Sequence, residues 1–86
     1  MKITKKAVAN KLAAYIRHGL SLDDLVEWAE HAMQEGAFAE KDAKIISSVV
    51  APLGVADVRA FGLTWEECES MLKRLGFSAR VAIFTA

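Results

Sequence analysis

The spacing of hydrophobic and polar positions predicts four amphipathic helices. In each segment the apolar residues return every three to four positions, the period of one buried helix face. The expected buried stripes are, in chain order, Val8, Leu12, Tyr15 and Ile16; Leu22, Leu25, Val26, Ala29, Ala32 and Met33; Ile45, Ile46, Val49, Val50 and Leu53; and Met71, Leu72 and Leu75. Together these stripes predict one small helical core.

Capping residues indicate where three of these helices begin. Thr4, Ser21 and Thr64 each precede a stripe, and their side-chain oxygens can accept a hydrogen bond from the first helical turn. Glu67 follows Thr64 by three residues, which is the spacing of a capping box. We therefore expect helices to start directly after these three residues.

Glycine and proline indicate where the helices end. Gly19 follows the first stripe and is expected to adopt the left-handed conformation that stops a helix. Because Pro52 cannot donate a backbone hydrogen bond, the third helix is expected over about 40–51. With only Gly19 and Leu20 between the first two helices, the sequence predicts an αα-hairpin. The second and fourth helices are expected to end at Gly36 and Gly76.

The end of the chain has a different pattern. Residues 78–84 are short and rich in strand-forming side chains, and we expect a strand there. A strand needs a neighbour for its backbone hydrogen bonds, and the internal candidate is residues 57–61, which could equally form a turn of helix. Without that neighbour, the edge is free to pair with a second copy of the chain. The expected fold is a predominantly α, α+β domain of four helices with a C-terminal strand.

Length and composition restrict the class of protein. The 86 residues are expected to form a single domain spanning 1–86, and 53% of them are hydrophobic, which argues against intrinsic disorder. The single cysteine excludes a disulfide framework. The sequence has no apolar stretch long enough for a membrane span and no recognisable secretory signal, so we expect a cytoplasmic protein.

Charge is balanced in total but segregated along the chain. Residues 1–20 carry five basic and no acidic side chains, whereas residues 21–40 carry six acidic and no basic ones. Blocks of opposite sign in consecutive segments suggest two elements that fold back on each other. A positively charged first helix and a negatively charged second helix are therefore expected side by side.

One stretch resembles a known group of proteins. The run Leu-Gly-Val-Ala-Asp-Val-Arg-Ala-Phe-Gly-Leu-Thr-Trp-Glu-Glu-Cys-Glu-Ser-Met-Leu begins at Leu53, and the resemblance covers Leu53–Phe77. It is similar to a segment of small bacterial proteins with no assigned activity, and the similarity extends to the segment that starts at Leu22. This resemblance implies a bacterial origin and transfers no catalytic motif.

The sequence gives little support to catalysis or metal binding. His18, His31 and Cys68 show no zinc-ligand spacing, and the glycines do not form a phosphate-binding loop. Cys68 lies among glutamates, which would raise its pKa and weaken it as a nucleophile, and its position suits a small buried residue. We therefore expect no enzymatic activity and no cofactor.

A basic first helix raises the alternative of a small nucleic-acid-associated regulatory protein. Its phosphate contacts would come from Lys2, Lys5, Lys6 and Lys11. The neutral total charge and the acidic segment that follows disfavour this alternative, since both would weaken attraction to phosphates.

Two tryptophans suggest an interaction surface instead. Trp28 lies beside the main apolar stripe of the second helix, and Trp65 occupies the first position of the fourth helix. Tryptophan is enriched at the centres of protein interfaces, although it also covers the edges of small cores. The expected partner-binding residues are Asp23, Glu27, Trp28, Glu30 and Trp65.

The expected partner is another protein, with a basic surface that complements the second helix. A homodimer formed through the edge of the C-terminal strand is a compatible alternative. The residues expected at that edge are Arg80, Val81, Ile83 and Phe84.

Overall fold

The computed structural model describes residues 2–58 and 63–77. They form a predominantly α, α+β fold, as the sequence predicted, with four α-helices and a short parallel sheet. The α-helices are α1 (Lys5–Ile16), α2 (Leu22–Glu35), α3 (Ala43–Leu53) and α4 (Trp65–Arg74). The 3₁₀ helices are η1 (Glu40–Asp42) and η2 (Ala56–Val58), and the strands are β1 (Lys2–Ile3) and β2 (Ala37–Phe38).

The three predicted helix starts are confirmed. Thr4, Ser21 and Thr64 each accept a hydrogen bond of 3.1 Å from the backbone N–H three residues further along the chain. The Thr64 hydroxyl also lies 3.3 Å from the Glu67 carboxylate, to which it donates. Each cap satisfies an N–H group that the first helical turn leaves without a partner, and so fixes where the helix begins.

The end of α1 differs from the prediction. His18, not Gly19, adopts the left-handed conformation, with φ of 63°. Its N–H donates to the carbonyl of Tyr15 at 3.0 Å, and that of Gly19 donates to Ala14 at 2.8 Å, which is a Schellman motif. The segment between α1 and α2 is therefore residues 17–21 instead of the two residues expected.

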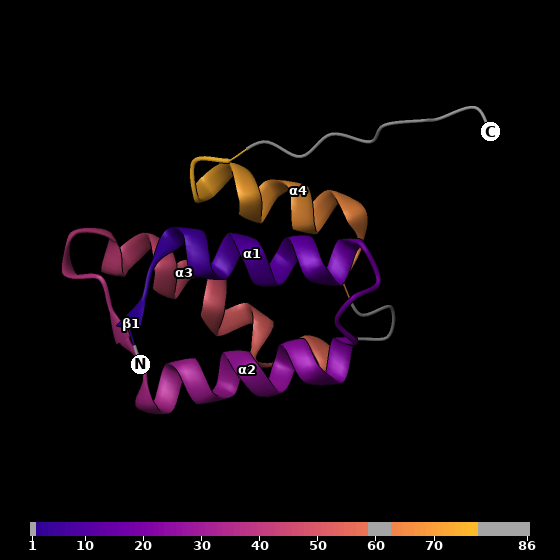
Figure 1. The fold of residues 1–86 in the computed structure, drawn as a ribbon, viewed down its shortest axis with the longest axis horizontal. Coiled ribbons are helices and arrows are strands. Elements are labelled where there is room, and N and C mark those ends of the chain that lie inside the picture. Colours follow the sequence, from indigo (N-terminus) through magenta and orange to yellow (C-terminus); the bar gives the residue numbers. More distant parts are fainter. Residues whose placement is uncertain (1, 59–62, 78–86) are drawn as a thin grey trace.

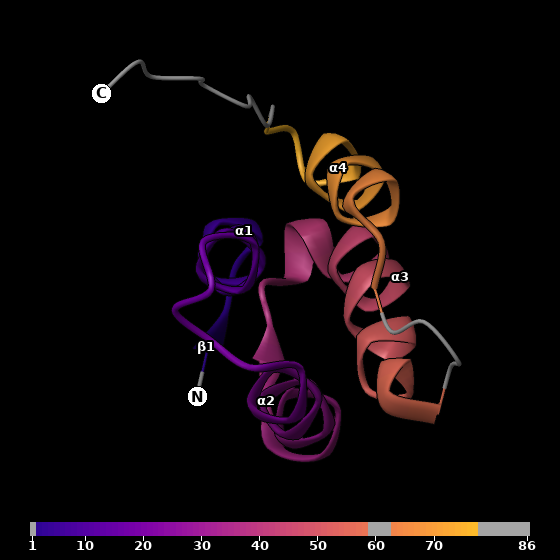
Figure 2. The same cartoon turned by 90° about the vertical axis from the view of Figure 1, so that its right-hand side faces the viewer.

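The first two helices form the predicted hairpin. Figure 1 shows α1 and α2 running in opposite directions, joined at the right-hand end of the view. Figure 2, which looks along these helices, shows α3 lying to one side of both, with α4 next to α1 and α3. The most extensive helix packing is between α2 and α3. The core therefore lies where α1, α2 and α3 face one another, and α4 covers it.

Most of the predicted stripes supply the core. Its largest fully buried side chains are Ile3, Leu12, Leu25, Ile46, Leu53 and Leu75. Two predictions are wrong, because Met33 is 45% exposed and Ile45 is 39% exposed. Each directly neighbours a fully buried residue, Ala32 or Ile46. Since successive helical residues point about 100° apart, Met33 and Ile45 lie at the outer edges of their stripes, turned away from the core.

A short parallel sheet ties the first residues to the end of α2. Lys2 pairs with Ala37 and Ile3 with Phe38, and the Ala39 N–H donates to the Ile3 carbonyl at 2.9 Å. The sequence did not predict these strands, because two residues are too few to show an alternating pattern. Phe38 is half-buried and packs against the core.

The other predicted strands fall mainly outside the described residues. This applies to the expected strand over 78–84 and to residues 59–61 of its possible neighbour. Asp57 and Val58, which begin that neighbour, lie in η2 and not in a strand.

Helix α3 continues further than expected. It includes Pro52 and ends at Leu53, whereas η1 occupies the start of the predicted segment. Proline in the last turn removes one backbone donor without preventing helical dihedral angles. Within the described part of the chain, no helix has the length and apolar content that a membrane crossing requires.

Candidate functional site

A hollow of about 380 Å³ lies around Trp28, between the outward faces of α1 and α2. We call it the Trp28 hollow. Its lining residues are Lys11, Leu20, Asp24, Glu27, Trp28 and His31. The Lys11 ammonium lies 5.7 Å from the centre of the Trp28 ring, within the range of a cation–π interaction. Trp28 is half-buried and packs against the core, so one part of the indole supports the fold while another faces the hollow.

Helical spacing brings most of this lining together. Asp24, Trp28 and His31 are separated by four and three residues on α2, and therefore share one side of that helix. Helix α1 contributes Lys11, and the turn between the two helices contributes Leu20. Neither was expected at a partner-binding site, since Lys11 belongs to the basic residues of the first helix and Leu20 to the expected turn. Only the packing of α1 on α2 reveals that they meet Trp28.

Of the predicted acidic residues, one lines the hollow and two lie elsewhere on α2. Glu27 lines it directly, and Asp23 and Glu30 lie exposed on the same helix. Glu30 lies next to Gly54, which directly follows α3. A Cβ atom added to Gly54 would be 3.7 Å from the Cγ atom of Glu30.

None of the carboxylates near the hollow has an ion-pair partner among residues 2–58 and 63–77. The four are Asp23, Asp24, Glu27 and Glu30, and all are exposed. The expected attraction between the lysines of α1 and these acids forms no ion pair in that part of the chain. Lys5 pairs instead with Asp42 of η1, at 3.7 Å. The negative charge of α2 is therefore left facing outward.

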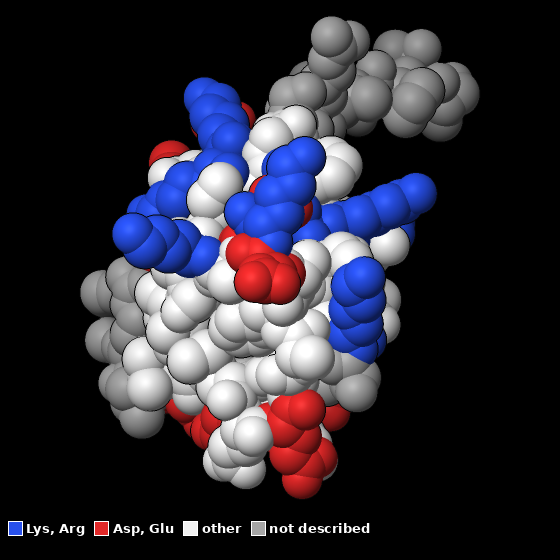
Figure 3. All heavy atoms as spheres, turned by 90° about the vertical axis from the view of Figure 1, so that its left-hand side faces the viewer, with Lys and Arg blue, Asp and Glu red and all other residues white. Residues whose placement is uncertain are grey.

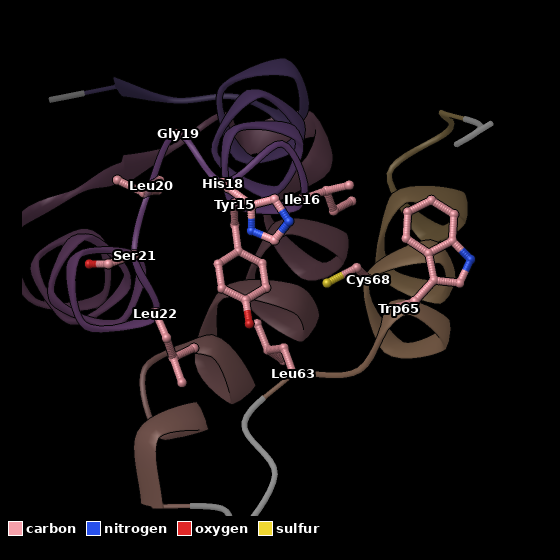
Figure 4. Close-up of a pocket in the computed structure, with 10 residues that line it drawn as sticks. All are labelled: Tyr15, Ile16, His18, Gly19, Leu20, Ser21, Leu22, Leu63, Trp65 and Cys68. Carbon is pink, nitrogen blue, oxygen red and sulfur yellow. The ribbon is translucent and has the colours of Figure 1, made fainter. Parts of the chain in front are cut away.

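Trp65 lies at a second depression, which we call the Trp65 groove. It has a volume of about 570 Å³, and Leu20 borders both it and the Trp28 hollow. Figure 4 shows the end of α1 and the following turn on one side of the groove and α4 on the other. The lining residues are Tyr15, Ile16, His18, Gly19, Leu20, Ser21, Leu22, Leu63, Trp65 and Cys68. The two tryptophans expected at one site thus line two neighbouring depressions.

The position of Cys68 in this groove argues against a reactive thiol. The residue is 1% exposed, and its sulfur points from α4 towards the α1 side of the groove (Figure 4). Burial raises the pKa of the Cys68 thiol above its usual value, and the charge of Glu67 raises it further. A thiol with a raised pKa carries little of the nucleophilic thiolate at neutral pH.

The histidines and the cysteine do not gather at one place. His18 and Cys68 border the Trp65 groove, whereas His31 borders the Trp28 hollow. Among the residues that the structure describes, no three histidine, cysteine or acidic side chains are grouped closely enough to hold a metal ion.

The four lysines of the nucleic-acid alternative do not act as one free group. Lys11 lies against Trp28 and Lys5 pairs with Asp42, whereas Lys2 and Lys6 are exposed. The residues expected at a dimer edge, Arg80, Val81, Ile83 and Phe84, lie outside the described residues.

Comparison with known proteins adds no family assignment. No protein-family model matches the chain, and no curated protein or solved structure matches it significantly. The geometry of the two depressions and the charges around them are therefore the features that bear on function.

Proposed function

We propose that this chain is a non-catalytic protein-interaction module. Its Trp28 hollow would bind a basic, amphipathic segment of another protein. The observation that supports this proposal most is the combination of an indole and a leucine in one hollow with two exposed carboxylates, Asp24 and Glu27, in its lining. A partner with lysine or arginine next to apolar residues matches that combination in both charge and polarity.

The contact between Lys11 and Trp28 suggests how a partner is held. An ammonium group already lies 5.7 Å from the ring centre, so this face of the indole accepts a cation. A basic side chain of the partner would take a similar position, and its neighbours would pair with Asp24 and Glu27. Exposed ion pairs contribute only about 0–1 kcal/mol each. The carboxylates would therefore mainly steer the encounter, and Trp28 with Leu20 would supply the apolar contact.

The proposal can be tested with a synthetic helical peptide of alternating lysine and leucine clusters. We expect the full chain to bind it, with weaker binding as the salt concentration rises. The double variant Asp24→Asn with Glu27→Gln removes two charges from the hollow and should weaken binding about tenfold. The matched control, Glu40→Gln with Glu66→Gln, removes two charges from η1 and α4 and should bind as the unchanged chain does. Equal losses in both variants would reveal non-specific attraction and overturn the proposal.

Tryptophan fluorescence identifies which depression is used. In the variant Trp65→Phe, Trp28 is the only indole, and its emission should shift when the peptide binds. In the variant Trp28→Phe, only Trp65 reports, and its emission should stay unchanged. A shift confined to Trp65 would place the peptide in the Trp65 groove and contradict the role given to Trp28.

A further inference from the structure

Basic side chains that are far apart in the sequence gather at one end of the molecule. Figure 3 looks at this end and shows most of the visible lysines and arginines over its upper part, with a few acidic side chains among them and others at its lower edge. We call this region the basic end. The elements that begin or end there carry these basic residues: Lys2 of β1, Lys5 and Lys6 of α1, Lys41 of η1, Lys44 of α3, and Lys73 and Arg74 of α4.

Specific contacts bring these residues together. The ion pair between Lys5 and Asp42 joins the start of α1 to η1, which leads directly into α3. The hydrogen bond from Arg74 to the Ser48 carbonyl, at 3.2 Å, joins the end of α4 to α3. The basic end therefore draws on β1, α1, η1, α3 and α4. The sequence pattern indicated only the basic residues of 1–20, because the other basic residues come from later segments that packing brings to the same end.

Several of these charges are available to a partner. Lys2, Lys6, Lys41 and Lys44 are exposed and form no ion pair within residues 2–58 and 63–77. Helix α2 carries four exposed carboxylates without an ion-pair partner in the same described residues, and two of them, Asp24 and Glu27, line the Trp28 hollow. The two surfaces are therefore complementary in sign.

We infer that the basic end docks on the Trp28 hollow of a second copy of this chain. This inference rests on the proposed function and names the partner as the protein itself. Two different surfaces meet in such a contact, so the pair keeps one free surface of each kind: the Trp28 hollow of one copy and the basic end of the other. A contact of this type is heterologous and adds further copies in a head-to-tail row. Ile45, which is 39% exposed and directly follows Lys44, provides an apolar side chain next to these charges.

A nucleic acid is a less suitable occupant of the basic end. Glu40 is exposed on η1, between the basic residues of α1 and those of α3. The carboxylates of α2 would also repel a long polyanion, and a protein that binds phosphates usually has an excess of basic residues. A second copy instead offers an acidic surface of limited extent.

The test uses two variants that each lose one surface. The acid-surface variant carries Asp23→Asn, Asp24→Asn and Glu27→Gln, and the base-surface variant carries Lys6→Gln, Lys41→Gln and Lys44→Gln. Sedimentation velocity should show that the unchanged chain grows in mass with concentration at 20 mM salt and remains monomeric at 500 mM. Each variant alone should be monomeric at both salt concentrations. Their mixture should stop at a one-to-one dimer, because only one pair of complementary surfaces remains.

A control variant separates docking from general attraction. The variant Asp57→Asn with Glu66→Gln removes two negative charges from η2 and α4 and keeps the α2 carboxylates. It should associate as the unchanged chain does. A monomeric mixture, or association by either surface variant alone, would overturn the inference.

Two further outcomes are informative about the partner. If the unchanged chain is monomeric at 20 mM salt but binds a 20-base-pair DNA duplex, the basic end serves a nucleic acid and the inference is wrong. If the chain is monomeric but still binds the lysine–leucine peptide, self-docking fails and the proposed function stands. Failure of both binding experiments would remove both proposals.

Discussion

Arg74 donates a hydrogen bond of 3.2 Å to the backbone carbonyl of Ser48, which is the carbonyl left without its helical donor by Pro52. In an α-helix the N–H of residue 52 would bond to the carbonyl of residue 48, but proline has no N–H. The guanidinium of α4 therefore supplies the hydrogen bond that α3 lacks. One side chain both satisfies a backbone acceptor and links the last helix to the third.

This relationship predicts that Arg74 and Pro52 are energetically coupled. The variant Arg74→Ala should lower the free energy of unfolding by about 1 kcal/mol, because it leaves the Ser48 carbonyl to solvent. In a Pro52→Ala background the new N–H can bond to that carbonyl, so the same replacement should cost much less. A double-mutant cycle measured by urea denaturation gives the coupling free energy.

Lys73 provides the control for this cycle. It neighbours Arg74 and pairs with Glu69 on its own helix, at 3.7 Å. Since that pair does not involve α3, Lys73→Ala should have the same small effect with or without Pro52. If Arg74→Ala lowers the free energy of unfolding equally with Pro52 and with Pro52→Ala, the two residues are not coupled through the Ser48 carbonyl.

Gly36 is predicted to be required for the junction between α2 and the sheet. A Cβ atom added there would lie 2.5 Å from the Ala32 carbonyl oxygen and 2.8 Å from Cγ1 of the buried Ile3. Either backbone or core must then move, and Gly36→Ala should cost about 1–3 kcal/mol. Gly54→Ala is the matched control, because the nearest atom would lie 3.5 Å away and φ is −64°. Thermal unfolding should show a clear loss only for Gly36→Ala.

His18 is predicted to destabilise the end of α1. Its φ of 63° places a side chain in the left-handed region, which costs a residue with a Cβ about 1–2 kcal/mol. His18→Gly removes this strain and should raise the free energy of unfolding by up to about 1 kcal/mol, since glycine also makes the unfolded chain more flexible. Gly19→Ala, by contrast, should be tolerated, because the nearest atom would lie 3.5 Å from the added Cβ. A free energy of unfolding that His18→Gly leaves unchanged or lowers would contradict backbone strain at His18.

Much of the fold could be predicted because local signals and helix packing agree. The caps Thr4, Ser21 and Thr64 and the apolar stripes require only sequence spacing. The structure confirms the caps and most positions of the stripes, with Met33 and Ile45 as exceptions. The two-residue strands could not be predicted, because their pairing depends on Gly36 allowing Ile3 to approach α2. The left-handed residue at the end of α1 is His18 and not the predicted Gly19. The prediction followed the preference of glycine for this conformation, whereas the position is set by the residue at which α1 ends.

The surfaces were less predictable than the core. Helical spacing placed Glu27 beside Trp28, but it gave no information about Lys11, which comes from another helix. Spacing also could not show that Trp28 and Trp65 line different depressions. That depends on where the turn between α1 and α2, which borders both, lies in space. The charge blocks indicated opposite signs in neighbouring helices, yet the structure leaves the acids of α2 facing outward.

Cys68 provides a prediction about pH. Burial raises the pKa of its thiol in the folded protein above the ordinary value of 9.0. The unfolded chain therefore loses this proton at lower pH than the folded protein does, and the stability that the buried neutral thiol provides declines as the pH rises through 9 and above. The difference in free energy of unfolding between the unchanged chain and Cys68→Ala should shrink over this range, as measured by urea denaturation at several pH values. A difference that stays constant with pH would contradict a raised pKa, as would rapid reaction of the folded chain with a thiol reagent at pH 8.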